Sequence, residues 1–436
     1  MAASGTAVGG VIPLSQRATM LRPPATLAIM AKAKALQREG APVISFGLGE
    51  PDFDTPERIK RAAADALVAG QTHYMPTLGD PETRRVIAEK LVRENGLEGV
   101  TEAHVAISTG AKQSLYLVCQ CLLGGGTEGR RDGGTKGEGA SDEALLPVPA
   151  WVSYAPMVQL AGGRVRELPT EAKSGFKISA AQLKAAITPR SRVLFLNSPS
   201  NPCGTMYTPG ELREIAAVVA EAAATVAPNL VIVTDEIYEK IIYGGIPHFS
   251  IGSVPEVAER TVTINGLSKA FAMTGWRIGY AAAPGEFGAR LMKAFEALQG
   301  QMTSCITSFL YPAIRVALRE CAEDTERFRQ RFAQRAELVC GRLAAIPGLP
   351  APRPTGAFYV FPDVSAHYGK RSHGGKEIRT GMDFAEALLS EHHVAVVPGE
   401  EFGGVGKNHV RLSFACAEEE IEQGMTRVAH FVAGLR

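Results

Sequence analysis

The sequence predicts an α/β fold with a mostly parallel sheet, and two observations carry this prediction. Continuous β-rich apolar runs recur in the middle of the chain, and each stops at polar residues: 193–196, 230–233 and 261–264. Such runs are typical of strands that are buried on both faces of a parallel sheet. Helical stretches lie between them, as in repeated βαβ units. Because ligands of these sheets bind beyond the carboxyl ends of the strands, the polar residues there are the first candidates for a functional site.

The first helix between these strands has a clear start signal. Thr208-Pro209-Gly210-Glu211 combines a capping box with proline at the first helical position. We therefore predict a helix that continues to about Ala224.

The length and a change of character near residue 325 predict two domains. A chain of 436 residues exceeds what one hydrophobic core usually serves. After residue 325 a basic helix is followed by short alternating strands at 358–361, 394–397 and 410–414. The expected division is a flexible N-terminal segment (1–20), a large domain (49–324), and a smaller α+β domain formed by residues 21–48 and 325–436.

One segment interrupts the large domain. Residues 124–143 are rich in glycine and charge and contain no apolar residue larger than alanine. Such a segment buries too little surface to offset its ordering entropy, so a disordered loop is predicted. The alternative, a nucleotide-binding glycine loop, lacks the required GxGxxG or GxxxxGK[ST] spacing.

Composition excludes several classes of function. The net charge of +1 gives no electrostatic reason to expect nucleic acid or a membrane surface as a partner, and no apolar run could span a bilayer. None of the seven cysteines lies in a CxxC pair, so neither a disulfide framework nor a metal site is predicted. A reducing intracellular compartment is expected. The Ala-, Ser- and Gly-rich N-terminus would also suit the remnant of a plastid transit peptide, or simply a mobile end.

The most specific motif is the string from Gly266 to Gly279, GLSKAFAMTGWRIG. It resembles the lysine-attachment signature of the class I aminotransferases, which use pyridoxal 5′-phosphate (PLP) on a type I fold with a seven-stranded type of sheet. The resemblance implies that Lys269 forms an imine with the cofactor and later moves the substrate's α-proton. It also implies that Arg277 binds the cofactor phosphate.

Other motifs of the same family follow in the expected order. Asp235-Glu236-Ile237-Tyr238 ends a buried strand, and the resemblance implies that Asp235 pairs with the pyridinium nitrogen while Tyr238 donates to the ring's phenolate oxygen. The loop 197–204 (NSPSNPCG) resembles the family's NxPxNPTG loop and places Asn201 at the same oxygen. Cys203 replaces the usual threonine.

Further matches complete the cofactor and substrate sites. Gly110 and Ala111 open an apolar helix, whose free amides and dipole suit a phosphate. Trp151 matches the aromatic plate on the cofactor ring, and Tyr74 matches a tyrosine that reaches the phosphate of a neighbouring subunit, which implies a homodimer. Arg411 matches the arginine that binds the substrate α-carboxylate, with the backbone of Gly49 beside it.

Within the family, the chain is most similar to the aspartate/prephenate aminotransferase branch. The strings GEPDFDTP (49–56) and KAFAMTGWRIGY (269–280) carry this narrower match. It implies amino transfer between aspartate or glutamate and 2-oxoglutarate or oxaloacetate, with prephenate as a further acceptor that yields arogenate. Lys112 and Thr26 would bind the distal carboxylate. Pro24 stands where the branch usually has serine, which leaves this recognition open.

Two other functions remain open at this point. A lyase that catalyses β-elimination would share Lys269, Asp235 and Arg411, and only Lys112 and Thr26 argue against it. A non-enzymatic PLP-binding regulator would be favoured by a missing lysine or an added basic DNA-binding domain, neither of which the sequence has.

Overall fold

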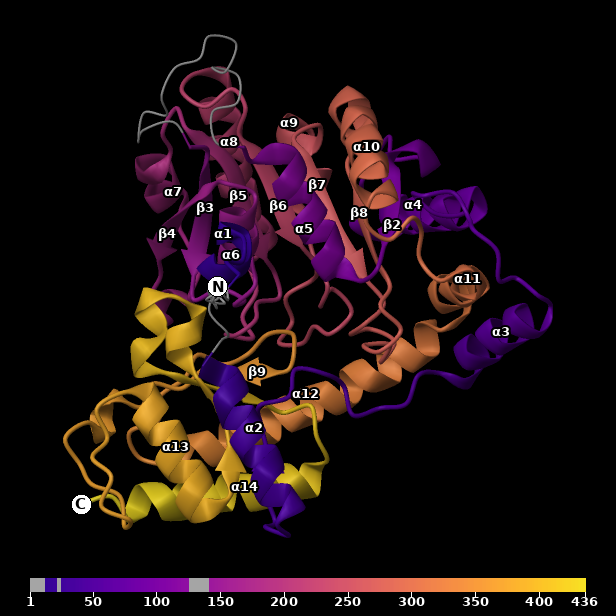
Figure 1. Ribbon diagram of the computed structural model, residues 1–436. Helices are drawn as coiled ribbons and strands as arrows, with labels where there is room; N and C mark the ends of the chain where they lie inside the picture. The colour runs from indigo at the N-terminus through magenta and orange to yellow at the C-terminus, as the bar shows by residue number, and fades with distance from the viewer. Residues whose placement is uncertain (1–11, 22–24, 125–140) are drawn as a thin grey trace, which may run out of the picture.

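The computed structural model describes residues 12–21, 25–124 and 141–436, with only the backbone of residues 25–28 (Figure 1). At its centre is a seven-stranded sheet of order β2-β8-β7-β6-β5-β3-β4. Only β8 runs antiparallel to its neighbours, so the predicted, mostly parallel α/β sheet is confirmed. The strands are β2 (Val105–Ser108), β3 (Glu143–Val148), β4 (Arg164–Pro169), β5 (Ser191–Asn197), β6 (Val231–Asp235), β7 (Thr261–Gly266) and β8 (Gly279–Ala282).

Helices cover both faces of this sheet. One apolar core joins the sheet to α5 (Ala111–Leu122), α6 (Tyr154–Leu160) and α10 (Gly285–Gly300). The opposite core joins it to α7 (Ala180–Ala186), α8 (Pro209–Ala224) and α9 (Pro255–Ala258). A third core, at the β2 edge, contains α3 (Glu57–Val68), α4 (Pro81–Asn95) and α11 (Tyr311–Glu320). The predicted helix 209–224 is confirmed, and Thr208 and Glu211 form its capping box.

A second group of elements lies below the sheet in Figure 1 and has its own core. Its strands form a three-stranded antiparallel sheet and a two-stranded parallel pair. The predicted domain boundaries at 48/49 and 324/325 stay a prediction; the helix expected at 325 starts three residues earlier, at Ala322. The elements are α2 (Ala25–Arg38), β1 (Ile44–Ser45), α12 (Ala322–Ala344), β9 (Tyr359–Val360), α13 (Gly381–His392), β10 (Val394–Ala395), β11 (Val397–Pro398), β12 (Val410–Ser413) and α14 (Glu418–Ala433).

Short helices complete the fold. Gln16–Met20 form α1, which Ser15 caps, while residues 1–11 of the segment expected to be flexible lie outside the described chain. Along the described stretches, no helix is both long and apolar enough to cross a membrane. The 3-10 helices are η1 (Glu102–His104), η3 (Ala172–Ser174), η4 (Ile251–Ser253), η5 (Ser308–Leu310), η6 (Ser365–His367), η7 (Gly399–Phe402) and η8 (Gly404–Asn408).

The predicted insert is shorter than the range 124–143. Residues 125–140 lie outside the described part, so the expected disorder is not addressed there. The prediction is wrong at Glu143, which begins β3 and is only 3% exposed. Its carboxylate accepts hydrogen bonds from Arg190 (2.8 Å) and Thr188 (2.8 Å), and these partners make burial of the charge tolerable.

The ends of the insert are close enough to be joined. The Gly124 amide donates to the Asp142 carboxylate at 3.0 Å. Replacing residues 125–140 by a short Gly-Ser linker should therefore leave the melting temperature within a few degrees and turnover within a few-fold. The matched control, Glu143→Ala, should lower stability by about 1–2 kcal/mol in thermal denaturation, because Arg190 and Thr188 lose their acceptor. A loss of turnover by orders of magnitude in the linker variant would show that the insert belongs to the active site.

Candidate active site

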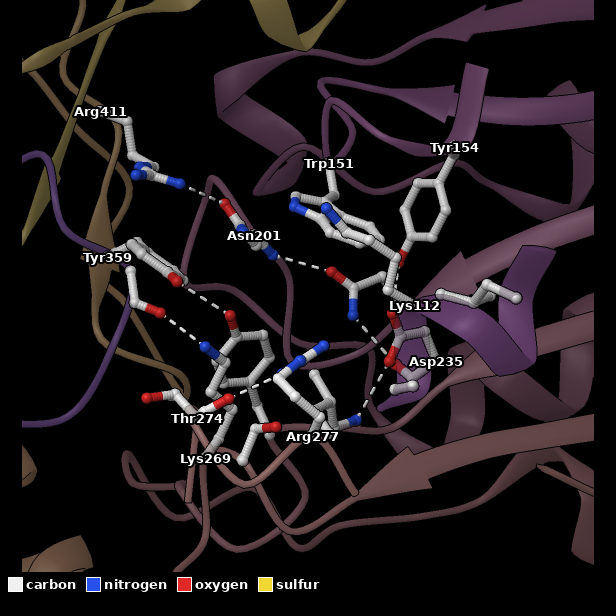
Figure 2. Close-up of a pocket in the computed structure, with 17 residues that line it drawn as sticks. Lys112, Trp151, Tyr154, Asn201, Asp235, Lys269, Thr274, Arg277, Tyr359 and Arg411 are labelled. Atoms are coloured by element: carbon white, nitrogen blue, oxygen red, sulfur yellow. Dashed lines mark hydrogen bonds between the residues drawn. The ribbon is translucent and has the colours of Figure 1, made fainter. Parts of the chain in front are cut away.

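A cavity of about 390 Å³ lies where β5, β6 and β7 end (Figure 2). Most of the site residues predicted from the sequence line it, and they come from distant parts of the chain. These are Gly49, Ala111, Lys112, Trp151, Asn201, Asp235, Tyr238, Lys269, Arg277 and Arg411.

Lys269 follows strand β7 and extends into the cavity. Its ammonium donates a 2.5 Å hydrogen bond to the carbonyl of Gly49. Burial lowers the pKa of Lys269 to about 8, and the guanidinium groups of Arg411 and Arg277 act in the same direction against the carboxylate of Glu50. A substantial fraction of this amine is therefore neutral near pH 8, as a nucleophile and a general base require.

Asp235 is the last residue of β6 and lies at the base of the cavity, 5% exposed. Its carboxylate accepts a 2.7 Å hydrogen bond from the Tyr154 hydroxyl and a 3.3 Å bond from the Ile237 amide. Burial raises the pKa of Asp235 to about 6, although these hydrogen bonds favour the ionised form. No lysine or arginine in the described chain forms an ion pair with Asp235, so it can accept a cationic partner from a ligand.

Arg411 is a buried cation on the other side of the cavity. It extends from β12 and is 8% exposed. Its guanidinium donates to the Asn201 side chain (3.0 Å) and to the Gly47 carbonyl (2.8 Å), while the buried Nε has no partner. Within the described residues no carboxylate pairs with it, and burial lowers the pKa of Arg411. A buried, unpaired guanidinium of this kind is a binding site for a carboxylate.

Asn201 is fixed by a short chain of hydrogen bonds from the sheet. The Asn197 amide donates to the Asp235 carbonyl (2.9 Å), and the Asn197 side-chain oxygen accepts from the backbone of Asn201 (2.8 Å). The loop 197–204 thereby places Asn201 between Arg411 and the base of the cavity (Figure 2).

The third part of the cavity is suited to an anion. Gly110 caps α5 with φ of 83°, and a Cβ there would lie 2.4 Å from an Arg277 nitrogen, so glycine lets the guanidinium approach the helix N-terminus. Lys112, in the first turn of α5, places its ammonium 4.9 Å from the ring centroid of Trp151. Burial lowers the pKa of Lys112, and the charge of Arg277 lowers it further.

The segment 47–53 crosses the cavity between Lys269 and Arg411. The Gly47 carbonyl accepts from Arg411, and the Gly49 carbonyl accepts from Lys269. Asp52 holds this segment through a two-point ion pair with Arg335 (2.6 and 2.8 Å), a side chain of α12 that is only 2% exposed. The segment is thus anchored to the second group of elements.

Of the predicted site residues that the structure describes in full, Gly110 and Tyr74 are not among those that line the cavity. Tyr74 is 89% exposed and is not among the lining residues of a single chain. Thr26 lies in α2, but its side chain is outside the described part, as is Pro24.

Sequence reasoning also missed residues that the structure adds. Tyr154 and Tyr359 line the cavity. Their hydroxyls are hydrogen-bonded to Asp235, which is 81 residues from Tyr154 in the sequence, and to Tyr238, which is 121 residues from Tyr359. For Tyr154, its position three residues after Trp151 was the available signal. Tyr359 lies in an apolar strand and carried none.

A buried charge network lies behind Asp235 and Tyr238. Glu236, Glu239 and His248 are, in the described residues, a possible set of metal ligands. However, Lys90 pairs with Glu239, and Asn95 donates to both carboxylates (2.9 and 2.7 Å). The carboxylates already have protein partners, since His248 also lies 3.2 Å from Glu236, and the network supports the turn that carries Asp235 and Tyr238.

Comparison with known proteins matches the model of the family "Aminotransferase class I and II" to residues 41–428. The chain belongs to the class I and II aminotransferases. It is 40% identical to the aspartate aminotransferase of Rhizobium meliloti (92% of each chain). It is 41% identical to the aspartate/prephenate aminotransferase of Cereibacter sphaeroides (97% of this chain, 99% of the relative).

Solved structures agree with this assignment. The crystal structure of the R. meliloti enzyme matches with a TM-score of 0.88 at 39% identity, covering 98% of this chain and 100% of the other. The aspartate aminotransferase of Thermus thermophilus with maleate matches at 0.84 and 38%, covering 97% and 100%. These relatives give no support to the lyase alternative. Since those named here are bacterial, they also give none to a plastid location.

The aminotransferase catalyses transamination and depends on PLP. The residues of the cavity fit this cofactor. Asp235 is a buried acid without a cationic partner, as a pyridinium nitrogen requires. The α5 N-terminus with Arg277 suits the phosphate, and the amine of Lys269 opens into the same cavity.

Proposed function

We propose that this aminotransferase exchanges the amino group of aspartate or glutamate with 2-oxoglutarate or oxaloacetate, and that prephenate is a further acceptor that yields arogenate. The observation that carries this proposal is a pair of cations, Arg411 and Lys112, which line the same cavity (Figure 2). In the described chain neither forms an ion pair with a carboxylate, so both are available to a dicarboxylic substrate. The similar Thermus thermophilus structure is named with maleate, which is a dicarboxylate.

Each residue of the cavity is assigned a role in this reaction. Arg411 and Asn201 hold the α-carboxylate, with the backbone of Gly49 beside it, while Lys112 and Thr26 hold the distal carboxylate. Trp151 stacks on the cofactor ring, and Gly110, Ala111 and Arg277 bind its phosphate.

When bound, PLP supplies a ring that withdraws the negative charge developing at the substrate's α-carbon. Lys269 carries the cofactor and moves the α-proton, because its amine has a lowered pKa and reaches the cavity. Asp235 keeps a proton on the ring nitrogen, and Tyr238 donates to the ring oxygen, as does Asn201.

We also infer a homodimer in a reducing intracellular compartment, in keeping with seven free cysteines. Tyr74, exposed in one chain, would reach the phosphate bound by its partner. Large apolar side chains are exposed as well, among them Leu67, Val68 and Met302 (49, 89 and 51%). Burial against a second copy would remove this surface from water.

The assignment of Lys112 predicts a change of specificity. If its ammonium binds the distal carboxylate, the charge-assisted hydrogen bond contributes about 1.5–3 kcal/mol. Lys112→Ala should then lower kcat/KM for aspartate by roughly 10- to 150-fold and should affect prephenate similarly. A monocarboxylic amino acid should be nearly unaffected. Steady-state kinetics with a panel of amino donors against 2-oxoglutarate, oxaloacetate and prephenate measures this.

Two variants serve as controls. Lys112→Arg keeps the charge and should retain more of the discrimination than Lys112→Ala. Thr26→Val should act in the same direction but more weakly, because a neutral hydroxyl contributes about half as much. If all substrates declined together and cofactor affinity fell, Lys112 would instead be a phosphate ligand, and its role in specificity would be refuted.

A further inference from the structure

Tyr359 links two parts of the active site. It is 1% exposed and lies in β9, which pairs with β12, the strand of Arg411. Its hydroxyl oxygen is 2.8 Å from that of Tyr238, with the ring centroids 5.8 Å apart at 85°. The guanidinium carbon of Arg411 is 4.7 Å from the Tyr359 ring centroid (Figure 2). Tyr359 therefore stands between the proposed carboxylate site and the proposed ligand of the cofactor's ring oxygen.

Either hydroxyl could be the donor of this hydrogen bond, and the surroundings favour one direction. Among the described residues, Tyr238 is the hydrogen-bond partner of the Tyr359 hydroxyl. A Cβ on Gly49 would lie 2.9 Å from the same hydroxyl, so the segment 47–53 packs closely against it. Burial raises the pKa of both tyrosines, and the charge of Arg411 acts to lower it in both, because a positive charge beside a phenol favours release of its proton. The Arg411 guanidinium lies directly against the ring of Tyr359 (4.7 Å), so Tyr359 is the stronger donor of the pair. Tyr359 then donates, and the proton of Tyr238 is free to point at an acceptor in the cavity.

We propose that Tyr359 is a positioning residue that donates to Tyr238, aims the Tyr238 proton at the cofactor's ring oxygen, and so connects that oxygen to Arg411. The inference rests on the role proposed above for Tyr238. With the cofactor held by Lys269, a hydrogen bond from Tyr238 would draw charge from the ring oxygen and make a proton on the Lys269 nitrogen easier to lose. Without the hydrogen bond from Tyr359, the bond from Tyr238 to the ring oxygen is weaker. The Lys269 nitrogen then keeps its proton to a higher pH.

The test is a pH titration of the visible absorption band of the holoenzyme. Tyr359→Phe should raise the pKa of the spectral change by about 0.5–1 unit, the equivalent of one hydrogen bond. Tyr238→Phe should raise it further. In the Tyr238→Phe background, Tyr359→Phe should add no shift, because the connection is already broken.

A matched control loses a partly buried hydroxyl beside the same strand. Tyr243 donates to the carbonyls of Gly356 (3.1 Å) and Ala357 (2.7 Å), just before β9, but does not line the cavity. Tyr243→Phe should leave the spectral pKa unchanged. An equal shift in Tyr243→Phe would mean that general support of β9 is the cause, and the inference would be overturned.

The remaining outcomes separate this inference from the proposed function. If Tyr238→Phe shifts the spectral pKa but Tyr359→Phe does not, Tyr359 has no such role and the proposed function stands. Additive shifts in the double variant would show that Tyr359 acts without Tyr238, which also overturns the inference. If Tyr238→Phe leaves the titration unchanged, the proposed role of Tyr238 fails, and the inference fails with it.

Discussion

Replacing Lys269 by alanine should reduce kcat by roughly 10⁴-fold or more. In the proposed assignment the variant loses both the amine that attaches the cofactor and the base that moves the α-proton, and positioned general bases alone contribute about 10²- to 10⁴-fold. Single-turnover kinetics with aspartate, after saturation with PLP, would measure the loss. Cofactor affinity should fall much less, because the proposed phosphate site at Gly110 and Arg277 is intact.

A chemical measurement accompanies this prediction. Borohydride reduction of the wild-type holoenzyme should remove its yellow colour and leave the pyridoxyl group covalently on Lys269, as located by mass spectrometry of peptides. Lys112→Ala serves as the control, since it removes another amine of the cavity and should retain the adduct on Lys269. An adduct on any other lysine would contradict the central assignment.

Asp235→Asn should lower kcat/KM by on the order of 10²- to 10³-fold. The substitution preserves size but removes the buried charge that we propose holds a proton on the ring nitrogen, and breaking a buried ion pair costs about 3–5 kcal/mol. Tyr154→Phe removes only the 2.7 Å hydrogen bond to this carboxylate and should cost about tenfold or less. If Asp235→Asn turned over as fast as wild type, Asp235 would not be the partner of the ring nitrogen.

In the apoprotein, the same substitution should raise thermal stability, although it lowers activity in the holoenzyme. Burial raises the pKa of Asp235 from 3.8 to about 6, so the folded apoprotein binds this proton more tightly than the unfolded chain. The contribution of Asp235 to stability is therefore present at low pH and is lost as the pH rises across that window. Relative to wild type, apo Asp235→Asn should gain melting temperature between pH 4 and pH 7. A constant difference in melting temperature would contradict the raised pKa.

The sequence predicts the residues of this site where the chemistry lies in one contiguous string. Lys269 and Arg277 belong to such a string, and Asp235 and Tyr238 to another at the end of a recognisable strand. Tyr154 and Tyr359 are different, because their place in the site depends on which strand ends lie next to each other in the fold. The contact between Tyr359 and Tyr238 requires β9 to pair with β12 beneath the sheet, and no local pattern specifies this pairing.

Similar reasons explain the other differences. The sequence places Glu143 at the end of a polar insert, because the partner that allows its burial, Arg190, is 47 residues away and gives no local signal. The fold class was predictable because alternation of buried strands and helices repeats along the chain and is a local signal. Tyr74 needs a second chain for its proposed contact, which one sequence cannot position.

Because of the segment 47–53, two of the cationic groups in the cavity, Arg411 and Lys269, already have neutral hydrogen-bond acceptors before a substrate arrives. Arg411 donates to the Gly47 carbonyl and Lys269 to the Gly49 carbonyl. In the proposed function, substrate binding at Arg411 is therefore a competition between the substrate's carboxylate and the Gly47 carbonyl. The free-energy gain is the difference between a charged and a neutral acceptor, and a charged acceptor makes a hydrogen bond about twice as strong. An amine without a carboxylate has no acceptor that binds Arg411 more strongly than the Gly47 carbonyl does. The backbone at Gly47 therefore disfavours the binding of such an amine.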